Sequence, residues 1–425
     1  MPDTALAAAI FAVTYAVIVS ERVHKTTAAL VGAVIMIGVG VLDQEEAFEF
    51  IDLNVIFLLA GMMMIINIMG KTGVFQWVAI RSAKLGRGEP LRILLILSLV
   101  TAVASAFLDN VTTVVLIAPV TLFVAGSLRV SPVPFLISEA LASNIGGAAT
   151  LIGDPPNILI GSAADLDFIS FVVNMGPIIV VLLALYLLAA RFLFFRGVTP
   201  QPEQRQRIME LDESHTITDP GLLRVSLAVL GLTLVGFLFH GPLGYEPASV
   251  ALMGASLLLL LTRQDPHEVL RDVEWPTLFF FIGLFIVVGG VEKVGILEDV
   301  GQRIADATAG SEAAAAILIL WVSAILSGIV DNIPYTAAMI PVVQEIDSGF
   351  GEEGRSDVLW WSLALGADLG GNLTIIAASA NVLVANLAER GGEKIPFWEF
   401  FRYGAPVTIA TTAVATGYLY LRYLI

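Results

Sequence analysis

Two Asp-Asn pairs are the first candidates for chemistry, because each interrupts a long apolar stretch of this 425-residue chain. They are Asp109-Asn110 and Asp331-Asn332. A carboxylate in the bilayer core costs at least about 2.5–3.5 kcal/mol, so one that persists there is a candidate for solute or proton binding. An aspartate at a helix start can instead cap it by accepting from free N–H groups, and Pro334 suits the first turn that follows. Both interpretations stay open on the sequence alone.

A second polar cluster lies at residues 143–157, which read Ser-Asn-Ile-Gly-Gly-Ala-Ala-Thr-Leu-Ile-Gly-Asp-Pro-Pro-Asn. Three glycines, two prolines and an aspartate cannot continue one membrane-spanning helix, so the sequence predicts a broken helix here. Asp154-Pro155-Pro156 would cap and start the outgoing half-helix and direct its positive dipole end at the middle of the membrane. The matching segment at 367–381 is interrupted by glycine and polar residues and lacks proline.

These clusters belong to a repeat that extends along the chain. An offset of 222 residues aligns Gly61 with Gly283 and Asp109-Asn110 with Asp331-Asn332. An offset of 224 aligns Gly146-Gly147 with Gly370-Gly371, Thr150 with Thr374 and Asn157 with Asn381. Shared hydrophobicity does not explain coincident glycines and polar residues, so the chain is interpreted as a tandem duplication.

The elements that position these residues are apolar runs long enough to cross a bilayer as helices, about 17 to 25 residues. They begin near residues 5, 26, 54, 134 and 168, and again near 221, 247, 277, 358 and 397. If each Asp-Asn stretch is a hairpin, each half crosses the membrane five times, and an odd number inverts the second half. We predict an all-α integral membrane protein of two inverted repeats, with about ten transmembrane helices, two re-entrant hairpins and two broken helices.

The predicted organisation has three parts. Residues 1–198 form the first repeat with a hairpin at 93–126, residues 199–219 form a cytoplasmic linker, and residues 220–425 form the second repeat with a hairpin at 313–346. Interfacial helices are expected at 74–85 and 296–308. Of the 22 lysines and arginines, 18 fall on the face that holds the linker. Since cytoplasmic loops are enriched in these residues, we expect a cell (inner) membrane protein with both termini outside.

Composition restricts the class further. The chain is 57% apolar and only 14% charged, against about 25% charged residues in soluble domains. A net charge of −16 excludes an electrostatic nucleic-acid binder. Cysteine is absent and the four histidines share no spacing, so no metal site, cofactor or catalytic residue is predicted. No Walker loop appears, so transport powered by ATP hydrolysis in this chain is not supported. Whether a separate ATPase subunit is a partner stays open.

The run Asn144 to Asn157, with Phe-Leu-Asp-Asn at 107–110 and Val-Asp-Asn-Ile-Pro at 330–334, resembles the ion transporter superfamily. Within it the chain is similar to the group of arsenite permeases, P protein and sodium–proton antiporters. The resemblance implies an elevator-type secondary transporter, usually a homodimer, that binds its substrate at the hairpin tips and helix breaks. The residues this implies are Asp109, Asn110, Asn144, Gly146, Thr150, Asp154 and Asn157, then Asp331, Asn332, Asp368, Gly370, Asn372, Thr374 and Asn381.

The function expected from these observations is export of arsenite or antimonite in exchange for protons, and thus arsenic resistance. The partners are then a small inorganic solute, a coupling ion (H⁺ or Na⁺) and the lipid bilayer. A sodium–proton antiporter is the main alternative, because the same aspartates could serve Na⁺. An organic anion transporter is disfavoured because buried carboxylates repel a dianion. A passive channel and an intramembrane enzyme are weaker alternatives, the latter because no zinc motif or nucleophile elbow appears.

Overall fold

The computed structural model describes residues 2–20, 22–194, 202–213, 215–308, 310–350 and 357–425. Within these residues the regular structure is entirely helical. Six helices are long and apolar enough to cross a membrane, or seven if the sharply bent pair α9 and α10 counts as one. The predicted all-α membrane fold is therefore confirmed, whereas the predicted number of ten spans stays a prediction.

The first half contains eleven helices among the described residues. They are α1 (Pro2–Ser20), α2 (Lys25–Gly38), α3 (Gln44–Glu49), α4 (Leu53–Gly70), α5 (Val74–Leu85), α6 (Pro90–Ser105), α7 (Asn110–Leu128), α8 (Val133–Gly147), α9 (Pro155–Ala164), α10 (Phe168–Asn174) and α11 (Gly176–Leu193). The helix pair α6 and α7 corresponds to the first predicted hairpin, and α8 and α9 to the first predicted broken helix.

Helix α12 (Pro202–Glu210) lies in the predicted linker, of which residues 199–201 and 214 are outside the described part. The second half continues with α13 (Pro220–Leu243), α14 (Pro247–Thr262), α15 (Pro266–Arg271), α16 (Trp275–Lys293), α17 (Ile296–Ala307), α18 (Glu312–Ser327), α19 (Asn332–Ser348), α20 (Val358–Gly370), α21 (Ser379–Arg390) and α22 (Phe397–Tyr423). Helices α18 and α19 match the second hairpin, and α20 and α21 the second broken helix.

Two crossings between the halves are built on glycine. Helix α4 packs on α14, and α2 packs on α16. A Cβ on Gly61 would lie 2.8 Å from the carbonyl carbon of Ala251, and one on Gly283 would lie 2.7 Å from that of Ala29. Both glycines and both alanines are related by the 222-residue offset, so the sequence repeat is also a repeat in packing.

The hairpins pack on the broken helices in the same paired way. Helix α6 lies along α8, and α18 lies along α20. Gly146 of α8 sits against the carbonyl oxygen of Ala102, and a Cβ on Gly370 of α20 would lie 2.7 Å from the carbonyl oxygen of Ala324. Only glycine allows backbones to approach this closely, which explains the two glycines predicted at the site.

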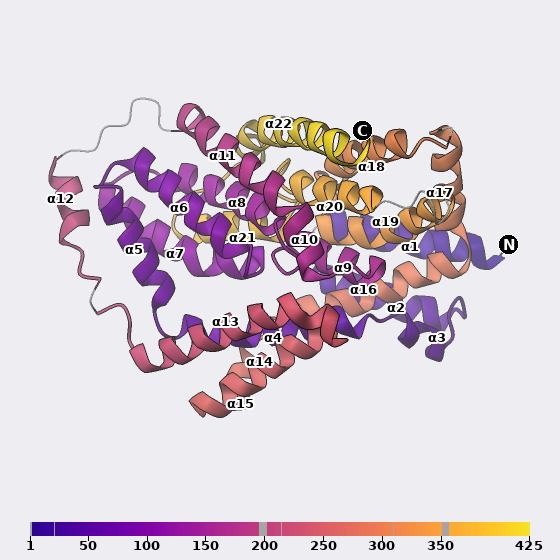
Figure 1. The fold of residues 1–425 in the computed structure, drawn as a ribbon, viewed down its shortest axis with the longest axis horizontal. Helices are drawn as coiled ribbons and strands as arrows, with labels where there is room; N and C mark the ends of the chain where they lie inside the picture. Colours follow the sequence, from indigo (N-terminus) through magenta and orange to yellow (C-terminus); the bar gives the residue numbers. More distant parts are fainter. Residues whose placement is uncertain (1, 21, 195–201, 214, 309, 351–356) are drawn as a thin grey trace.

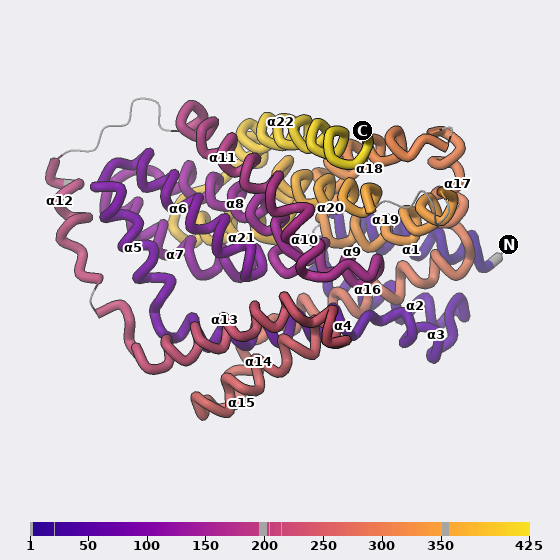
Figure 2. The backbone as a smooth tube through the Cα atoms, in the orientation of Figure 1, coloured from indigo at the N-terminus to yellow at the C-terminus, as the bar shows by residue number. Residues whose placement is uncertain are grey.

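The amphipathic helices α5 and α17 lie at opposite ends of the long axis in Figure 1, as inverted halves require. Helix α12 lies at the end with α5, and the N-terminus lies at the other end. In Figure 2 the first-half helix α4 runs beside α13 and α14, which follow about 170 residues later. The two halves are therefore interlocked.

Two expected spans are shorter than predicted. Helices α2 and α14 contain 14 and 16 residues, which at 1.5 Å per residue gives about 21 and 24 Å against a core of about 30 Å. Each is followed by a separate short helix, α3 or α15. Asp43 caps α3 and Asp265 caps α15, so the chain turns into a second short helix shortly after each of these two spans.

Candidate functional site

The hairpin tips are two capped helix starts. Asp109 caps α7 by accepting from the backbone N–H of Thr112 at 2.8 Å and from its hydroxyl at 2.5 Å. Asp331 caps α19 by accepting from the N–H of Ile333 at 3.1 Å. The capping interpretation therefore describes both tip aspartates, although each also faces the cavity described below.

Asp154 does not cap a helix with its side chain, in contrast to the role that the sequence predicted. Helix α9 does begin at Pro155, but the Asp154 side chain makes no capping bond. Its Oδ2 accepts from the amide of Asn110 at 2.8 Å, and its Oδ1 accepts from the amide of Asn332 at 3.3 Å. A single wholly buried carboxylate at the first break therefore joins both hairpin tips.

Asn144 of α8 is the centre of a buried amide cluster. Its Oδ1 accepts from Asn110 at 3.3 Å. Its Nδ2 lies 3.1 Å from Oδ1 of Asn381, 3.2 Å from Oδ1 of Asn372 and 3.2 Å from the carbonyl oxygen of Gly371. The first break is thereby connected to the second across the repeat.

Asn157 and Asn381 hold the breaks in equivalent ways. The Asn157 amide nitrogen donates to the carbonyl oxygens of Gly147 and Thr150 at 3.4 and 3.0 Å. The Asn381 amide nitrogen donates to those of Gly371 and Thr374 at 2.7 and 2.9 Å. Broken helices leave carbonyl groups unpaired, and these side chains satisfy them.

The fourteen predicted residues thus meet in one region. Thr150 and Thr374 anchor the breaks to the hairpins, since Thr150 donates to the carbonyl of Ala106 and Thr374 donates to that of Gly328 at 2.7 Å. Asp368 is wholly buried on α20. The structure brings these residues together, and their binding role stays a prediction.

A cavity of about 550 Å³ opens beside the tips. Asp109, Asp331 and Glu274 line it together with Lys25 and Ser379. Lys25 Nζ lies 2.7 Å from Oδ2 of Asp331 and 2.6 Å from the Ser379 hydroxyl. Sequence reasoning missed Lys25, Glu274 and Ser379, and it counted Lys25 among the charges of a membrane face. No spacing links residue 25 to residue 331, so only the fold reveals this pair.

The cavity carries an excess of negative charge. Asp109, Glu274 and Asp331 supply carboxylates, and the charge of Lys25 is already paired with Asp331. His24 also lines the cavity, but its Nδ1 accepts from the N–H of Thr26 at 3.3 Å. Like charges repel strongly at low dielectric, so the cavity favours a neutral or cationic solute over an organic anion.

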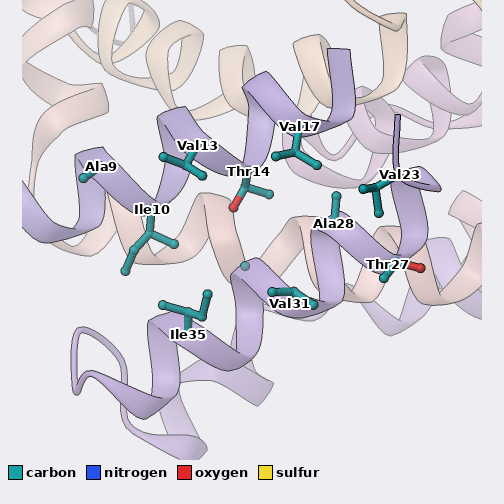
Figure 3. A pocket seen from close by; sticks show the side chains of 11 residues that line it. Ala9, Ile10, Val13, Thr14, Val17, Val23, Thr27, Ala28, Val31 and Ile35 are labelled. Atoms are coloured by element: carbon teal, nitrogen blue, oxygen red, sulfur yellow. The ribbon is translucent and has the colours of Figure 1, made fainter. Parts of the chain in front are cut away.

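A second cavity, of about 390 Å³, is an apolar crevice between α1 and α2. Figure 3 shows Ile10 and Val13 of α1 on one side and Val31 and Ile35 of α2 on the other. Val13 and Val31 are exposed, as expected for a surface that faces lipid. Thr14 and Thr27 are the polar residues among those that line this crevice, and the rest of its lining is apolar.

Ion pairs at the two ends of the molecule lie apart from the site. Lys71 lies 3.3 Å from Asp272 beside α15, and Lys293 lies 2.5 Å from Glu46 of α3. A hydrogen bond from Lys293 lowers the pKa of Glu46. Lys84 and Arg81 bind Glu213, and the Lys84 bond lowers its pKa. These lysines pair with acids of the connecting segments, away from the hairpin tips.

Duplicated helices interlocked around two breaks, two hairpin tips and a polar cavity define a multi-pass membrane transporter. The chain belongs to the citrate transporter family (CitMHS), which matches residues 15–366, within the ion transporter superfamily that its motifs resemble. It is 47% identical over 424 residues to an uncharacterized transporter of Mycobacterium tuberculosis, with 99% of both chains covered. It is 34% identical over 508 residues to the P protein of Homo sapiens, with 99% of this chain and 60% of that protein covered.

Two solved transporters share the fold at low sequence identity. YdaH of Alcanivorax borkumensis gives a TM-score of 0.59 at 13% identity, covering 89% of this chain and 86% of that one. MtrF of Neisseria gonorrhoeae, described within a class of antimetabolite efflux pumps, gives 0.62 at 11% identity, covering 92% and 85%. These likenesses support the fold.

Proposed function

We propose that this chain is a secondary active transporter that exports arsenite or antimonite in exchange for protons. The observation that carries this proposal is the charge of the cavity at the tips, where Asp109, Glu274 and Asp331 outnumber Lys25. Arsenous acid is neutral near pH 7 and behaves as a small polyol. Carboxylate, amide and hydroxyl groups can hold it without cysteine, which this chain lacks.

The same charge argues against citrate as the substrate, although the family is named for it. A citrate anion carries several negative charges and would enter a cavity that already has unpaired carboxylates. Coulomb repulsion between such groups reaches several kcal/mol at the effective dielectric of a protein site. We therefore assign this chain a neutral solute, in contrast to the substrate in the family's name.

The proposed movement is an elevator, in which hairpins and broken helices slide along a scaffold of α1, α2, α4, α13, α14 and α16. The contacts that support this movement join the scaffold helices to a hairpin. Lys25 pairs with Asp331 at one hairpin tip, and the hydroxyl of Tyr15 donates to the carbonyl of Pro334 at 2.8 Å. Such side-chain contacts can break and re-form as the mobile part moves, whereas interlocked glycine crossings cannot.

A sodium–proton antiporter is the second candidate, favoured by the acidic cavity. Oxygen ligands from Asp109, Glu274 and Ser379 suit Na⁺ as well as a polyol.

The proposals also include a homodimer in the cell membrane with both termini outside. The N-terminus and α12 lie at opposite ends of the molecule, which supports placing the terminus and the linker on different faces.

The experiment is uptake by proteoliposomes under an imposed pH gradient, with arsenite, antimonite, Na⁺, Li⁺ and citrate in parallel. Metalloid uptake that collapses with the gradient supports the proposal. Dissipation of the gradient by Na⁺ without metalloid flux indicates the antiporter. Citrate uptake would overturn the argument from cavity charge.

A further inference from the structure

The buried carboxyl of Asp368 is the unexplained group at the centre of the molecule. Asp368 is fully buried on α20, and among the described residues neither of its carboxyl oxygens makes a hydrogen bond. The Asn157 amide lies beside this carboxyl. Oδ1 of Asn157 is also buried and unpartnered among the described residues. Buried polar atoms are nearly always paired, so three such oxygens together require an explanation.

The repeat supplies an explanation, because it contains an equivalent pair of residues whose side chains are joined by a hydrogen bond. The 224-residue offset relates Asn144 to Asp368 and Asn381 to Asn157. In that hydrogen-bonded pair, Asn144 donates an N–H to Oδ1 of Asn381 at 3.1 Å. Asp368 occupies the position of the donor Asn144, and a carboxylate has no hydrogen to donate.

The orientation of Asn157 is fixed independently of Asp368. Its amide nitrogen donates to the carbonyls of Gly147 and Thr150, as the Asn381 nitrogen donates to Gly371 and Thr374. With both N–H groups of Asn157 used in this way, its contact to Asp368 is left to the oxygen. A carboxyl oxygen of Asp368 and Oδ1 of Asn157 attract each other only if a hydrogen or a cation lies between them.

We infer that Asp368 is protonated in this conformation and donates its O–H to Oδ1 of Asn157, as Asn144 donates to Asn381 in the other half. This deepens the proposed function and rests on it in one respect, since it makes Asp368 the residue that carries the exchanged proton. When Asp368 releases the proton to water, a carboxylate faces an amide oxygen. That repulsion destabilises the contact of α20 with α9 and favours movement.

The charged and titratable groups around Asp368 bear on whether it holds a proton. Asp154 is the charged group that acts on it directly, and Asp154 already accepts from Asn110 and Asn332. These two N–H donors act in favour of a carboxylate at Asp154 while its burial acts against one, and any negative charge there favours a neutral Asp368. The other titratable groups on elements that pack on α20 or on their caps are Glu139 of α8, Asp165 after α9, Glu312 of α18, Asp331, Tyr335, Glu345 and Asp347 of α19, and Glu399, Arg402, Tyr403, Tyr418, Tyr420, Arg422 and Tyr423 of α22.

The direct test is infrared spectroscopy of the purified full chain in lipid nanodiscs, in H₂O and in D₂O. A protonated carboxylic acid has a C=O stretch that carboxylates lack and that shifts on deuteration. Asp368→Asn should remove one such band. Glu139→Gln is the matched control, because Glu139 is a buried acid outside the site that accepts from Thr121, and this control should leave the Asp368 band in place. An unchanged spectrum in Asp368→Asn would overturn the inference, and so would a band that disappears when Na⁺ replaces K⁺.

A second measurement keeps the inference testable without a known substrate. Asp368→Asn restores a donor to Asn157, so its melting temperature should equal or exceed that of the wild type and stay flat as pH rises. The wild type should lose thermal stability over the same rise, because deprotonation leaves opposed oxygens. Parallel pH profiles for both proteins would contradict the inference. If both physical tests succeed while no metalloid uptake is found, the proposed substrate fails and the proton site stands.

Discussion

The two helix breaks have nearly the same backbone but exchange the positions of their acids. Asp154 precedes α9 with φ −139° and ψ 137°, and Ala378 precedes α21 with φ −145° and ψ 144°. The first half therefore has an acid where the second has alanine, and the second half has Asp368 where the first has Asn144. Each break therefore has one buried acid, before the second half-helix in the first break and within the first half-helix in the second. A duplicated scaffold can thus hold one carboxylate that joins the tips and another that carries a proton.

The hairpin tips differ in a second way. Asp331 has Lys25 as a partner, whereas the position equivalent to Lys25 in the second half is Pro247. Asp109 keeps only its bonds to Thr112 among the described residues. The second tip is thus tied to the scaffold by an ion pair and the first tip is not, so we expect the two hairpins to respond differently to substitution.

The largest effect should come from Asp154→Ala, which removes the acceptor shared by both tips. Asn332 then becomes a buried donor without its side-chain acceptor, at about 1–3 kcal/mol, and Asn110 keeps only its 3.3 Å bond to Asn144. We expect a large fall in melting temperature and loss of transport. Asp154→Asn keeps an acceptor oxygen and should cost much less stability. Equal melting temperatures for Asp154→Ala and the wild type would show that the tips do not depend on this carboxylate.

A pair of alanine substitutions sharpens the comparison of the breaks. Asn381→Ala removes two carbonyl contacts and the bond from Asn144, and Asn157→Ala removes two carbonyl contacts and the bond from Asp368, so the two should lower stability by similar amounts, about 1–3 kcal/mol. Asn157→Ala should be the more severe for substrate binding and transport, since its oxygen faces Asp368 in the half with the more interrupted helix. The checks are thermal melts and uptake at equal protein density in the membrane. A larger loss of transport in Asn381→Ala than in Asn157→Ala, at similar melting temperatures, would contradict the assignment.

Lys25→Met tests the tie at the second tip. Removing Lys25 leaves Asp331 with its capping bond but without a counter-charge, and the pair is partly exposed at 26% and 13%. We expect a coupling energy of about 1 kcal/mol between Lys25→Met and Asp331→Asn in a double-mutant cycle, less than for a fully buried pair. Additive effects would mean that the ion pair contributes nothing. Lys71→Met, at an outer connector, is the matched control.

The smallest effect concerns the connector after α12. Because Lys84 lowers the pKa of Glu213, the stabilisation is present above the ordinary glutamate range and is lost as pH falls through the lowered pKa. The protection factors of the amides at 202–213, which correct for the intrinsic pH dependence of exchange, should therefore fall at acid pH, and Glu213→Gln should show low protection at every pH. Transport near neutral pH should stay unchanged in this variant. Protection factors in the wild type that do not change with pH would contradict the role of the pair.

Much of this arrangement could be predicted from the sequence, because breaks in apolar runs are locally encoded. Asp109, Asp331 and Pro155 each begin a helix where the residue types require one. The partners could not be predicted. Asp154 bonds to Asn332 across 178 positions and Lys25 to Asp331 across 306, and no local pattern encodes such contacts. The sequence did not predict the shortness of α2 and α14 either, because an apolar run indicates a span but does not fix the length of its helix.

The central claim is that this chain exchanges protons for a neutral metalloid solute through Asp368. The most direct measurement follows arsenite flux and internal pH together in the same proteoliposomes, for the wild type and Asp368→Asn. The account predicts proton movement coupled to arsenite in the wild type. In Asp368→Asn it predicts no gradient-driven flux, with arsenite binding retained. Full gradient dependence in Asp368→Asn, or proton movement with Na⁺ and none with arsenite, would contradict it.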